Sequence, residues 1–139
     1  MGFLKRVMGQ ADSDAEMPKY NTLDVVGEGH YQEALISIAG PKTKHGLNEG
    51  LDDLPVMIQL KREPTNPYDK NAVQCLIEGK LVGYIDRQDA PALQDVLRQR
   101  EKKGLKAEVP GYIIGGWKRP GSEGNYSVRL GRVPGHDYG

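Results

Sequence analysis

The sequence predicts a mainly β domain of the α+β class, with six or seven short strands and one main helix. Several short runs alternate apolar and polar residues with a period of two, which is typical of half-buried strands. One segment carries instead the apolar stripe of an amphipathic helix. The 139 residues include eighteen glycines and nine prolines, a turn-rich composition that suits short strands better than a helical bundle.

The clearest strands flank one dense polar loop. Side chains alternate over 56–61 and again over 72–77, so two half-buried strands are predicted there. One face of the first would hold Val56, Ile58 and Leu60 and the other Met57, Gln59 and Lys61, and one face of the second would hold Val73, Cys75 and Ile77. A third strand is predicted at 80–85, and Glu78–Gly79 predicts a tight hairpin turn before it. Gly83 within this strand is expected to let another backbone or a ligand approach closely.

The other strands are predicted from shorter runs. The first covers 22–26 and continues after a glycine bend into 30–38. A later strand covers 105–114 and is expected to break at Pro110–Gly111, where neither residue favours a strand interior. The last strand covers 126–130.

The main helix is predicted at 87–103. Asp86 is a candidate N-cap, cations fill the last turns where the helix dipole favours them, and Gly104 ends the helix. A single helix late in a series of short strands predicts a small, modified OB-like β-barrel. Such barrels bind ligands on a sheet face and on its flanking loops.

The chain is expected to form one domain over 20–133, with a flexible leader at 1–19 and a flexible tail at 134–139. Two long polar or glycine-rich segments, 40–53 and 115–124, are predicted to be loops, and loops of this length are usually functional or disordered.

Composition excludes several classes of protein. The sequence has no apolar run of about 18 residues and no signal-peptide core, so we expect a cytoplasmic protein with no membrane partner. The net charge is zero, which argues against a coat of positive charge for generic nucleic-acid binding. Residues 1–60 hold five Lys/Arg and nine Asp/Glu, and residues 61–139 hold fourteen and ten. The second part therefore leaves room for a modest basic site, although an ordinary solvated surface explains the same charges.

The loop between the strands 56–61 and 72–77 is the main candidate for a binding site. Pro64 and Pro67 fix φ and push the residues before them into extended conformations. The loop tip presents the phenol of Tyr68, the carboxylate of Asp69 and the ammonium of Lys70. A plain connection needs only about two to five residues, so this loop carries more polar and aromatic groups than a turn requires.

These groups suit the end of a nucleic-acid strand. Aromatic rings stack on bases, at about 1–3 kcal/mol per stacked base, and cations hold the strand's backbone. A carboxylate accepts a hydrogen bond from a free 3′-hydroxyl and repels a terminal phosphate. Tyr68 and Asp69 on a proline-braced loop therefore predict a clamp for a free 3′ end.

The sequence leaves plainer structural explanations open. Asn66, Asp69 and Asn71 can cap the turn through Asx-type hydrogen bonds to the backbone. Tyr68 can pack on the barrel rim, and Arg87 can be an ordinary residue of the first helical turn.

Other kinds of site find no support in the sequence. The histidines and the one cysteine lack metal-ligand spacing: they are His30, His45, His136 and Cys75. No Walker-type phosphate loop and no serine nucleophile elbow is present. We therefore expect a binding module without enzymatic activity, cofactor or metal, and any ATPase or helicase activity would belong to a partner chain.

Three pieces of the chain, in this order, resemble the HIRAN domain family: Gly27–Gln32, Leu60–Val73 and Leu81–Arg87. The middle piece is the specific one, because it contains the uninterrupted run Arg-Glu-Pro-x-Asn-Pro-Tyr-Asp-x-Asn-Ala-Val. The resemblance covers about residues 21–115. It implies a modified OB-fold that occurs alone in bacteria or fused to DNA-remodelling ATPases, and that captures the free 3′ end of single-stranded DNA.

The resemblance also implies roles for single residues. Asp69 would accept a hydrogen bond from the terminal 3′-hydroxyl, while Tyr68 and Tyr31 would pack on the end nucleotides. Asn66 would hold the terminal sugar, and Arg87 would contact a phosphate. The expected DNA-binding set is completed by His30, Lys70 and Tyr84.

The chain departs from the family pattern at three positions. Gly29 stands where an arginine is expected, His30 replaces a stacking ring, and Tyr84 replaces a histidine. Tyr84 can also be explained by cross-strand packing. With fewer cations, we expect this chain to bind nucleic acid more weakly and with less dependence on salt. The same departures would also fit a different ligand.

The sequence as a whole predicts a nucleic-acid-binding module for free 3′-hydroxyl ends of single-stranded DNA, with a role in DNA repair or replication-fork processing. Two alternatives stay open. One is a protein–protein interaction module that recruits a DNA-remodelling partner, and the other is a small-nucleotide-binding domain.

Overall fold

The structure, a computed structural model, describes Met17 and residues 19–42 and 51–138. In this part of the chain six strands form one antiparallel sheet in the order β1-β4-β3-β2-β5-β8. In that order the strands are β1 (Val25–Val26), β4 (Lys80–Ile85), β3 (Val73–Ile77), β2 (Leu51–Arg62), β5 (Glu108–Gly115) and β8 (Tyr126–Leu130).

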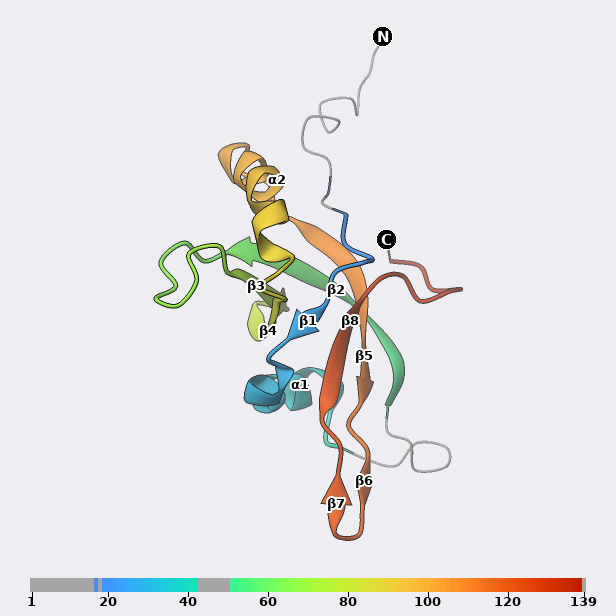
Figure 1. The fold of residues 1–139 in the computed structure, drawn as a ribbon. Coiled ribbons are helices and arrows are strands. Elements are labelled where there is room, and N and C mark those ends of the chain that lie inside the picture. Colours follow the sequence, from blue (N-terminus) through green and yellow to red (C-terminus); the bar gives the residue numbers. More distant parts are fainter. Residues whose placement is uncertain (1–16, 18, 43–50, 139) are drawn as a thin grey trace.

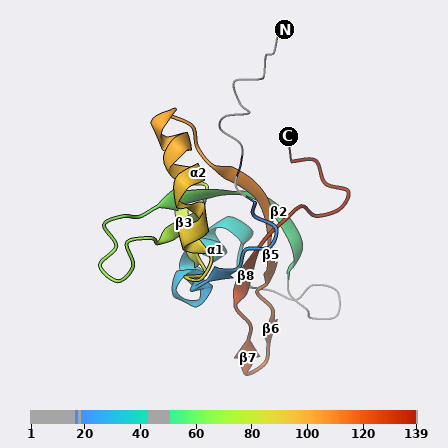
Figure 2. The same ribbon diagram turned by 45° about the horizontal axis from the view of Figure 1, so that its top comes forward.

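The sheet curls into a nearly closed barrel, because its two edge strands β1 and β8 come into contact. The helices α1 (Gln32–Ala39) and α2 (Ala90–Lys102) lie toward opposite ends of this barrel (Figure 1). The turned view shows α2 crossing in front of β3 and β2 (Figure 2). The predicted fold, a mainly β, OB-like barrel with one main helix, is confirmed.

Alternation along the strands decides which side chains fill the barrel. Ile58 and Leu60 of β2 are buried, while Lys61 of the same strand is exposed, as predicted. In β3 the same alternation buries Cys75 completely. Burial raises the pKa of the Cys75 thiol to about 12, with a smaller contribution from Glu28. The thiol therefore stays protonated and serves as a core residue.

The segment predicted as a strand over 30–38 is helical instead. The 3₁₀ helix η2 (Glu28–Tyr31) leads directly into α1. The Gln32 side-chain amide donates to the Tyr126 carbonyl oxygen over 3.0 Å and accepts from the Tyr126 backbone N–H over 2.9 Å. This two-sided bond attaches the start of α1 to β8. It joins residues far apart in the chain, so local alternation could not predict it.

The main helix begins later than predicted. It starts at Ala90 rather than at residue 87, and Asp86 does not cap it but accepts a backbone N–H in the turn before the helix. Pro91 has no N–H to donate, so it fits the first helical turn but not the interior position that a start at residue 87 would give it. The predicted end is confirmed, because Gly104 follows the helix with a φ of 69°.

Pro110–Gly111 does not interrupt the strand predicted over 105–114. β5 begins at Glu108 and runs unbroken to Gly115, pairing with β2 and with β8. A Cβ on Gly111 would collide with the Ile58 side chain and lie 2.6 Å from the Arg129 carbonyl oxygen. The glycine is therefore needed for close packing inside the barrel rather than for a turn.

The glycine-rich segment predicted as a loop over 115–124 contains a short two-stranded ribbon. Its strands are β6 (Lys118–Arg119) and β7 (Ser122–Glu123), which pair antiparallel and protrude at the lower end of Figure 1. A ribbon of two-residue strands carries no alternation, so the sequence offered no strand signal there.

Two predicted segments lie wholly or largely outside the described residues. These are the leader at 1–19, of which only Met17 and Lys19 are described, and residues 43–50 of the loop at 40–53. At the other end of the chain, the Tyr138 hydroxyl donates to the Gly111 carbonyl oxygen over 3.1 Å.

Close approach of β1 to β4 places the candidate loop beside η2. A Cβ on Gly83 would lie 2.8 Å from Val25 Cγ1 and 3.0 Å from the Val26 carbonyl oxygen, which confirms the predicted close contact. The chain then turns into η2, next to the end of β4. The loop joining β2 and β3 projects sideways from the barrel in both ribbon views (Figures 1 and 2).

We expect Gly111→Ala to lower the free energy of unfolding by about 1–3 kcal/mol, because overpacking forces shifts in a core without free space. Urea denaturation followed by circular dichroism measures this. Gly29→Ala is the matched control, since the nearest atom to its Cβ would be 3.7 Å away, an ordinary contact. Equal stability of the two variants would contradict the crowding of β5 against β2.

Candidate functional site

A pocket of about 660 Å³ opens where the β2–β3 loop faces η2 and the end of β4. Its wall combines residues from three separate parts of the chain: the segment from Val26 through η2, the loop, and the segment from Tyr84 to Arg87. Seven of the eight predicted site residues line it: His30, Tyr31, Asn66, Tyr68, Asp69, Tyr84 and Arg87. Lys70 is exposed on the loop and does not line the pocket.

Asn66 shapes the loop. Its Oδ1 accepts the backbone N–H groups of Tyr68 and Asp69 over 2.8 and 3.0 Å, and its Nδ2 donates to Glu63 Oε1 over 2.8 Å. The Asx-type turn that the sequence left as an alternative is therefore formed. These three bonds hold the tip of the loop in one conformation.

Asp69 divides its two carboxylate oxygens between the loop and a cation. Oδ1 accepts the Asn71 backbone N–H over 2.9 Å, and Oδ2 lies 3.5 Å from Arg87 Nε. Arg87 also donates from Nη2 to the Tyr68 carbonyl oxygen over 2.7 Å. The Asp69 side chain is 22% exposed and that of Arg87 is 71% exposed, so both groups can still reach a ligand in the pocket.

Aromatic rings form the rest of the wall. The centroids of Tyr31 and Tyr84 are 6.4 Å apart with the planes tilted by 46°, and His30 meets Tyr31 edge-on at 6.4 Å. Tyr68 stands apart from them at the loop tip and is 86% exposed. A large apolar ring exposed to this degree does not pack on the barrel rim, and its faces are open to a stacking partner.

Glu63 is the central residue of the site, and the sequence did not single it out. Its carboxylate accepts from the Tyr84 hydroxyl over 2.8 Å, from Asn66 Nδ2 over 2.8 Å and from Gln74 Nε2 over 2.9 Å. The bond from Asn66, and then that from Tyr84, lowers the pKa of Glu63 despite partial burial. The carboxylate therefore stays ionised and joins the loop to β3 and β4.

The same carboxylate fixes the state of Tyr84. Burial, and then the hydrogen bond to Glu63, raises the pKa of Tyr84 to about 12. The phenol therefore stays protonated at neutral pH and donates its hydrogen bond to Glu63. The only local signal for this arrangement was an acidic residue three positions before Asn66, the spacing at which side chains meet in a turn.

The charges around the pocket limit what it can hold. Two carboxylates, Glu63 and Asp69, face one guanidinium, Arg87. Such a balance is poor for a cluster of phosphates and favourable for hydroxyl or amine groups that donate hydrogen bonds. One phosphate beside Arg87 and a hydroxyl beside Asp69 would satisfy both charge types.

Two other kinds of feature can be assessed in the described residues, a metal site and a membrane span. Within Met17, 19–42 and 51–138, no group of three or more His, Cys, Asp or Glu side chains is arranged to hold a metal ion. Among the same residues no helix is long and apolar enough to cross a membrane.

Comparison with known proteins decides the family. The family model described as the HIRAN domain matches residues 40–112, just over half of the 139 residues. The chain belongs to the HIRAN domain family. The match includes the β2–β3 loop and the segment up to Arg87, whereas His30 and Tyr31 lie before it. No curated protein and no solved structure gave a significant match.

Membership of the HIRAN family indicates a nucleic-acid-binding module, since these domains bind rather than catalyse. In this chain the part matched by the family contributes most of the pocket, and η2 closes it with Tyr31 and His30. The pocket is therefore the candidate binding site of this HIRAN domain.

We expect Glu63→Gln to destabilise the fold at pH 7 by on the order of 1 kcal/mol, because the amide replaces one accepting oxygen by a donor. If the remaining oxygen keeps the bonds from Asn66 and Tyr84, the new donor faces the Gln74 amide donor. The pKa of Glu63 is lowered by folding, so its stabilising effect is present above about pH 4.5 and is lost as the pH falls through the folded-state pKa. The variant and the wild type should therefore differ in melting temperature at pH 7 and converge near pH 3.

Thermal melts from pH 3 to pH 7 measure this difference, with Glu108→Gln on the exposed surface of β5 as the control. A deficit that is as large at pH 3 as at pH 7 would show that the ionised carboxylate is not what holds the loop.

Proposed function

We propose that this HIRAN domain binds the free 3′-hydroxyl end of single-stranded DNA and acts at DNA ends in repair or replication-fork processing. The observation that carries the proposal is that one pocket is lined by Tyr68, Tyr31 and Tyr84 together with the Asp69–Arg87 pair. In this role the chain binds without catalysis, and an ATPase or helicase partner would supply any remodelling activity.

The aromatic residues account for binding of the bases. Tyr68 offers an exposed ring on a loop held rigid by Asn66, so little conformational entropy is lost when a base stacks on it. Tyr31 and Tyr84, whose ring centroids are 6.4 Å apart, line the same pocket and give a second base an aromatic surface. His30 meets the edge of Tyr31 and widens that surface.

The Asp69–Arg87 pair accounts for selection of the strand end. Each carboxylate oxygen has more than one acceptor site, so Asp69 can accept from a 3′-hydroxyl while it keeps its bonds to Asn71 and Arg87. A 3′-terminal phosphate would meet two carboxylates, Asp69 and Glu63, at the cost of like-charge repulsion. Arg87 remains exposed enough to contact the next phosphate along the strand.

Asn66 has a positioning role in this proposal rather than a direct contact with the sugar. Three of its hydrogen bonds are already made within the loop and to Glu63. Lys70 lies outside the pocket, so it would act at most as a cation near the entering strand.

The charge balance also favours a second candidate function. A pocket with two carboxylates and one guanidinium suits a protein amine, such as a chain terminus, as well as a DNA hydroxyl. In that case the module would recruit a DNA-remodelling partner through protein contacts. Phosphate contacts release counterions, so binding to them weakens as salt is added. DNA binding that hardly changes with salt concentration, or no DNA binding at all, would therefore favour this candidate.

The discriminating experiment is fluorescence anisotropy with a labelled 12-nucleotide strand that ends in a 3′-hydroxyl or a 3′-phosphate. We expect the wild type to prefer the hydroxyl by about ten-fold or more, since a hydrogen bond to a charged group is worth about 1.5–3 kcal/mol. Asp69→Asn keeps an acceptor for Asn71 but loses the charge, so the preference should fall to within about two-fold. Asp53→Asn, on the exposed surface of β2, is the control.

Equal binding of both strands by the wild type would refute end selection and leave a generic strand binder. A preference that survives in Asp69→Asn would remove Asp69 from the recognition of the end.

Replacing Tyr68 tests the aromatic contact separately. Tyr68→Ala should weaken binding of the hydroxyl-ended strand by about ten-fold, the loss of one stacked base, while thermal stability stays unchanged because the ring is exposed. Tyr68→Phe keeps the ring face and should bind like the wild type. If both variants bind equally, the ring takes no part in binding.

A further inference from the structure

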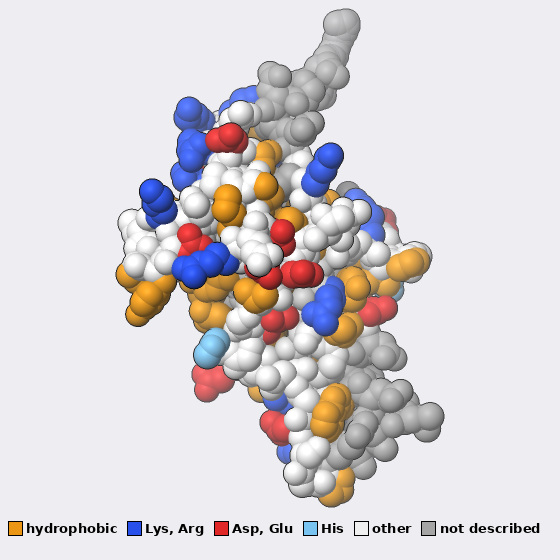
Figure 3. All heavy atoms as spheres, viewed as in Figure 1, with side chains coloured by type: hydrophobic (Ala, Val, Ile, Leu, Met, Phe, Trp, Pro, Cys, Tyr) orange, Lys and Arg blue, Asp and Glu red, His pale blue; other side chains and the backbone are white. Residues whose placement is uncertain are grey.

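The last turns of α2 carry the densest positive charge of the described chain. Residues 95–106 together with Arg62 hold six Lys/Arg against two Asp/Glu, a net charge of +4 in a chain whose net charge is zero. We call these six cations the basic end of α2: Arg62, Arg98, Arg100, Lys102, Lys103 and Lys106. Lys and Arg side chains gather over this end of the helix in Figure 3.

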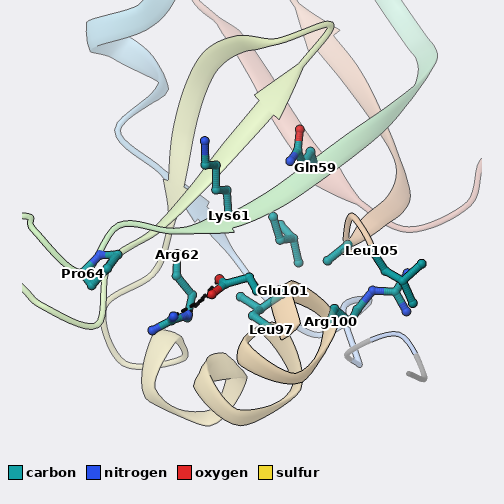
Figure 4. A pocket seen from close by; sticks show the side chains of 10 residues that line it. Gln59, Lys61, Arg62, Pro64, Leu97, Arg100, Glu101 and Leu105 are labelled. Atoms are coloured by element: carbon teal, nitrogen blue, oxygen red, sulfur yellow. Dashed lines mark hydrogen bonds and ion pairs between the residues drawn. The ribbon is translucent and has the colours of Figure 1, made fainter. Parts of the chain in front are cut away.

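Two of these cations, Arg62 and Arg100, line a small hollow of about 280 Å³ between α2 and the end of β2. Arg62 and Glu101 point toward each other across it (Figure 4), joined by two hydrogen bonds of 2.9 and 2.7 Å. Arg62, with Arg98 and Lys61 nearby, lowers the pKa of the Glu101 carboxyl. Several cations therefore converge on one carboxylate, which neutralises only part of their charge.

Helix stability explains only part of this surface. Cations in the last turn of a helix interact favourably with its dipole, which accounts for Arg100 and Lys102. Arg62 belongs to β2 and Lys106 follows the helix, so the dipole does not account for them.

The basic end of α2 adjoins the candidate pocket. Arg62 lines the hollow, and the next residue, Glu63, lines the pocket, so the two sites meet at one peptide unit. On α2, Gln94 donates to the Asn71 carbonyl oxygen at the end of the loop, and Arg98 follows one turn later on the same side of the helix. The helix thus leads from the loop to its basic end.

We propose that the basic end of α2 binds the phosphate backbone of the strand whose 3′ end occupies the pocket. This proposal rests on the proposed function and extends it from the end nucleotides to the strand that follows them. The thirteen residues of α2 span roughly 20 Å, and a strand that keeps the base stacking of a duplex advances about 3.4 Å per nucleotide. A strand of about six nucleotides therefore reaches from the pocket to the end of the helix.

The test compares a trinucleotide, which fills only the pocket, with a 12-nucleotide strand, both with a free 3′-hydroxyl, by isothermal titration calorimetry at several salt concentrations. The test variant is Arg98→Gln/Lys102→Gln/Lys106→Gln, which removes three exposed cations from the basic end of α2. The matched control is Arg132→Gln/Lys80→Gln/Lys118→Gln, which removes the same charges from exposed positions outside both the pocket and the hollow.

We expect the test variant to bind the 12-nucleotide strand about ten-fold more weakly at 0.1 M salt, with a salt slope shallower by about 2, because each phosphate contact on a single strand contributes about 0.7 to that slope. Binding of the trinucleotide should not change, and the control variant should bind both strands like the wild type.

Equal losses in the test and control variants would overturn the proposal, since the effect would then be one of overall charge. An unchanged slope and affinity in the test variant would also overturn it and leave the end-binding function intact. If the wild type itself binds neither strand, the proposed function fails, and this inference fails with it.

Discussion

The site depends on one hydrogen-bonded charge, the ionised carboxylate of Glu63. It accepts hydrogen bonds from the loop through Asn66, from β3 through Gln74 and from β4 through Tyr84. A projecting loop of this kind would otherwise sample many conformations, and binding would have to order it at a free-energy cost. With the carboxylate in place, the loop, its turn and the aromatic wall form one connected polar network before any ligand arrives.

The barrel supplies the geometry for this network by letting backbones approach closely. Gly83 allows β1 to pair closely with β4, and the chain that follows β1 brings η2 and Tyr31 to the same pocket as the loop. Gly111 lets β5 pack against Ile58 of β2, so that the long strand bearing the loop is fixed on both sides. The barrel therefore positions the pocket through close backbone contacts that are possible only at glycines.

The charge balance at the pocket differs from that at the end of α2. At the pocket, carboxylates outnumber cations, which favours a hydrogen-bond donor such as a hydroxyl and disfavours a terminal phosphate. At the end of α2, cations outnumber carboxylates, which favours phosphates. A neutral chain can in this way hold both the proposed end site and the proposed phosphate-binding surface, a combination that net charge alone conceals.

The sequence by itself determined the barrel, its inward-facing residues and the loop. Alternation depends only on the two-residue period of a strand, so it assigned Ile58 and Cys75 to the core correctly, and Asx chemistry is local, so the turn at Asn66 was foreseeable. Only the tertiary structure decided what depends on distant contacts. Gln32 attaches the start of helix α1 to β8, and Glu63 matters because two other strands reach it. Arg87 meets Asp69 because β4 ends beside the loop. A single sequence records no such pairings, since each partner is an ordinary polar residue until the fold brings the two together.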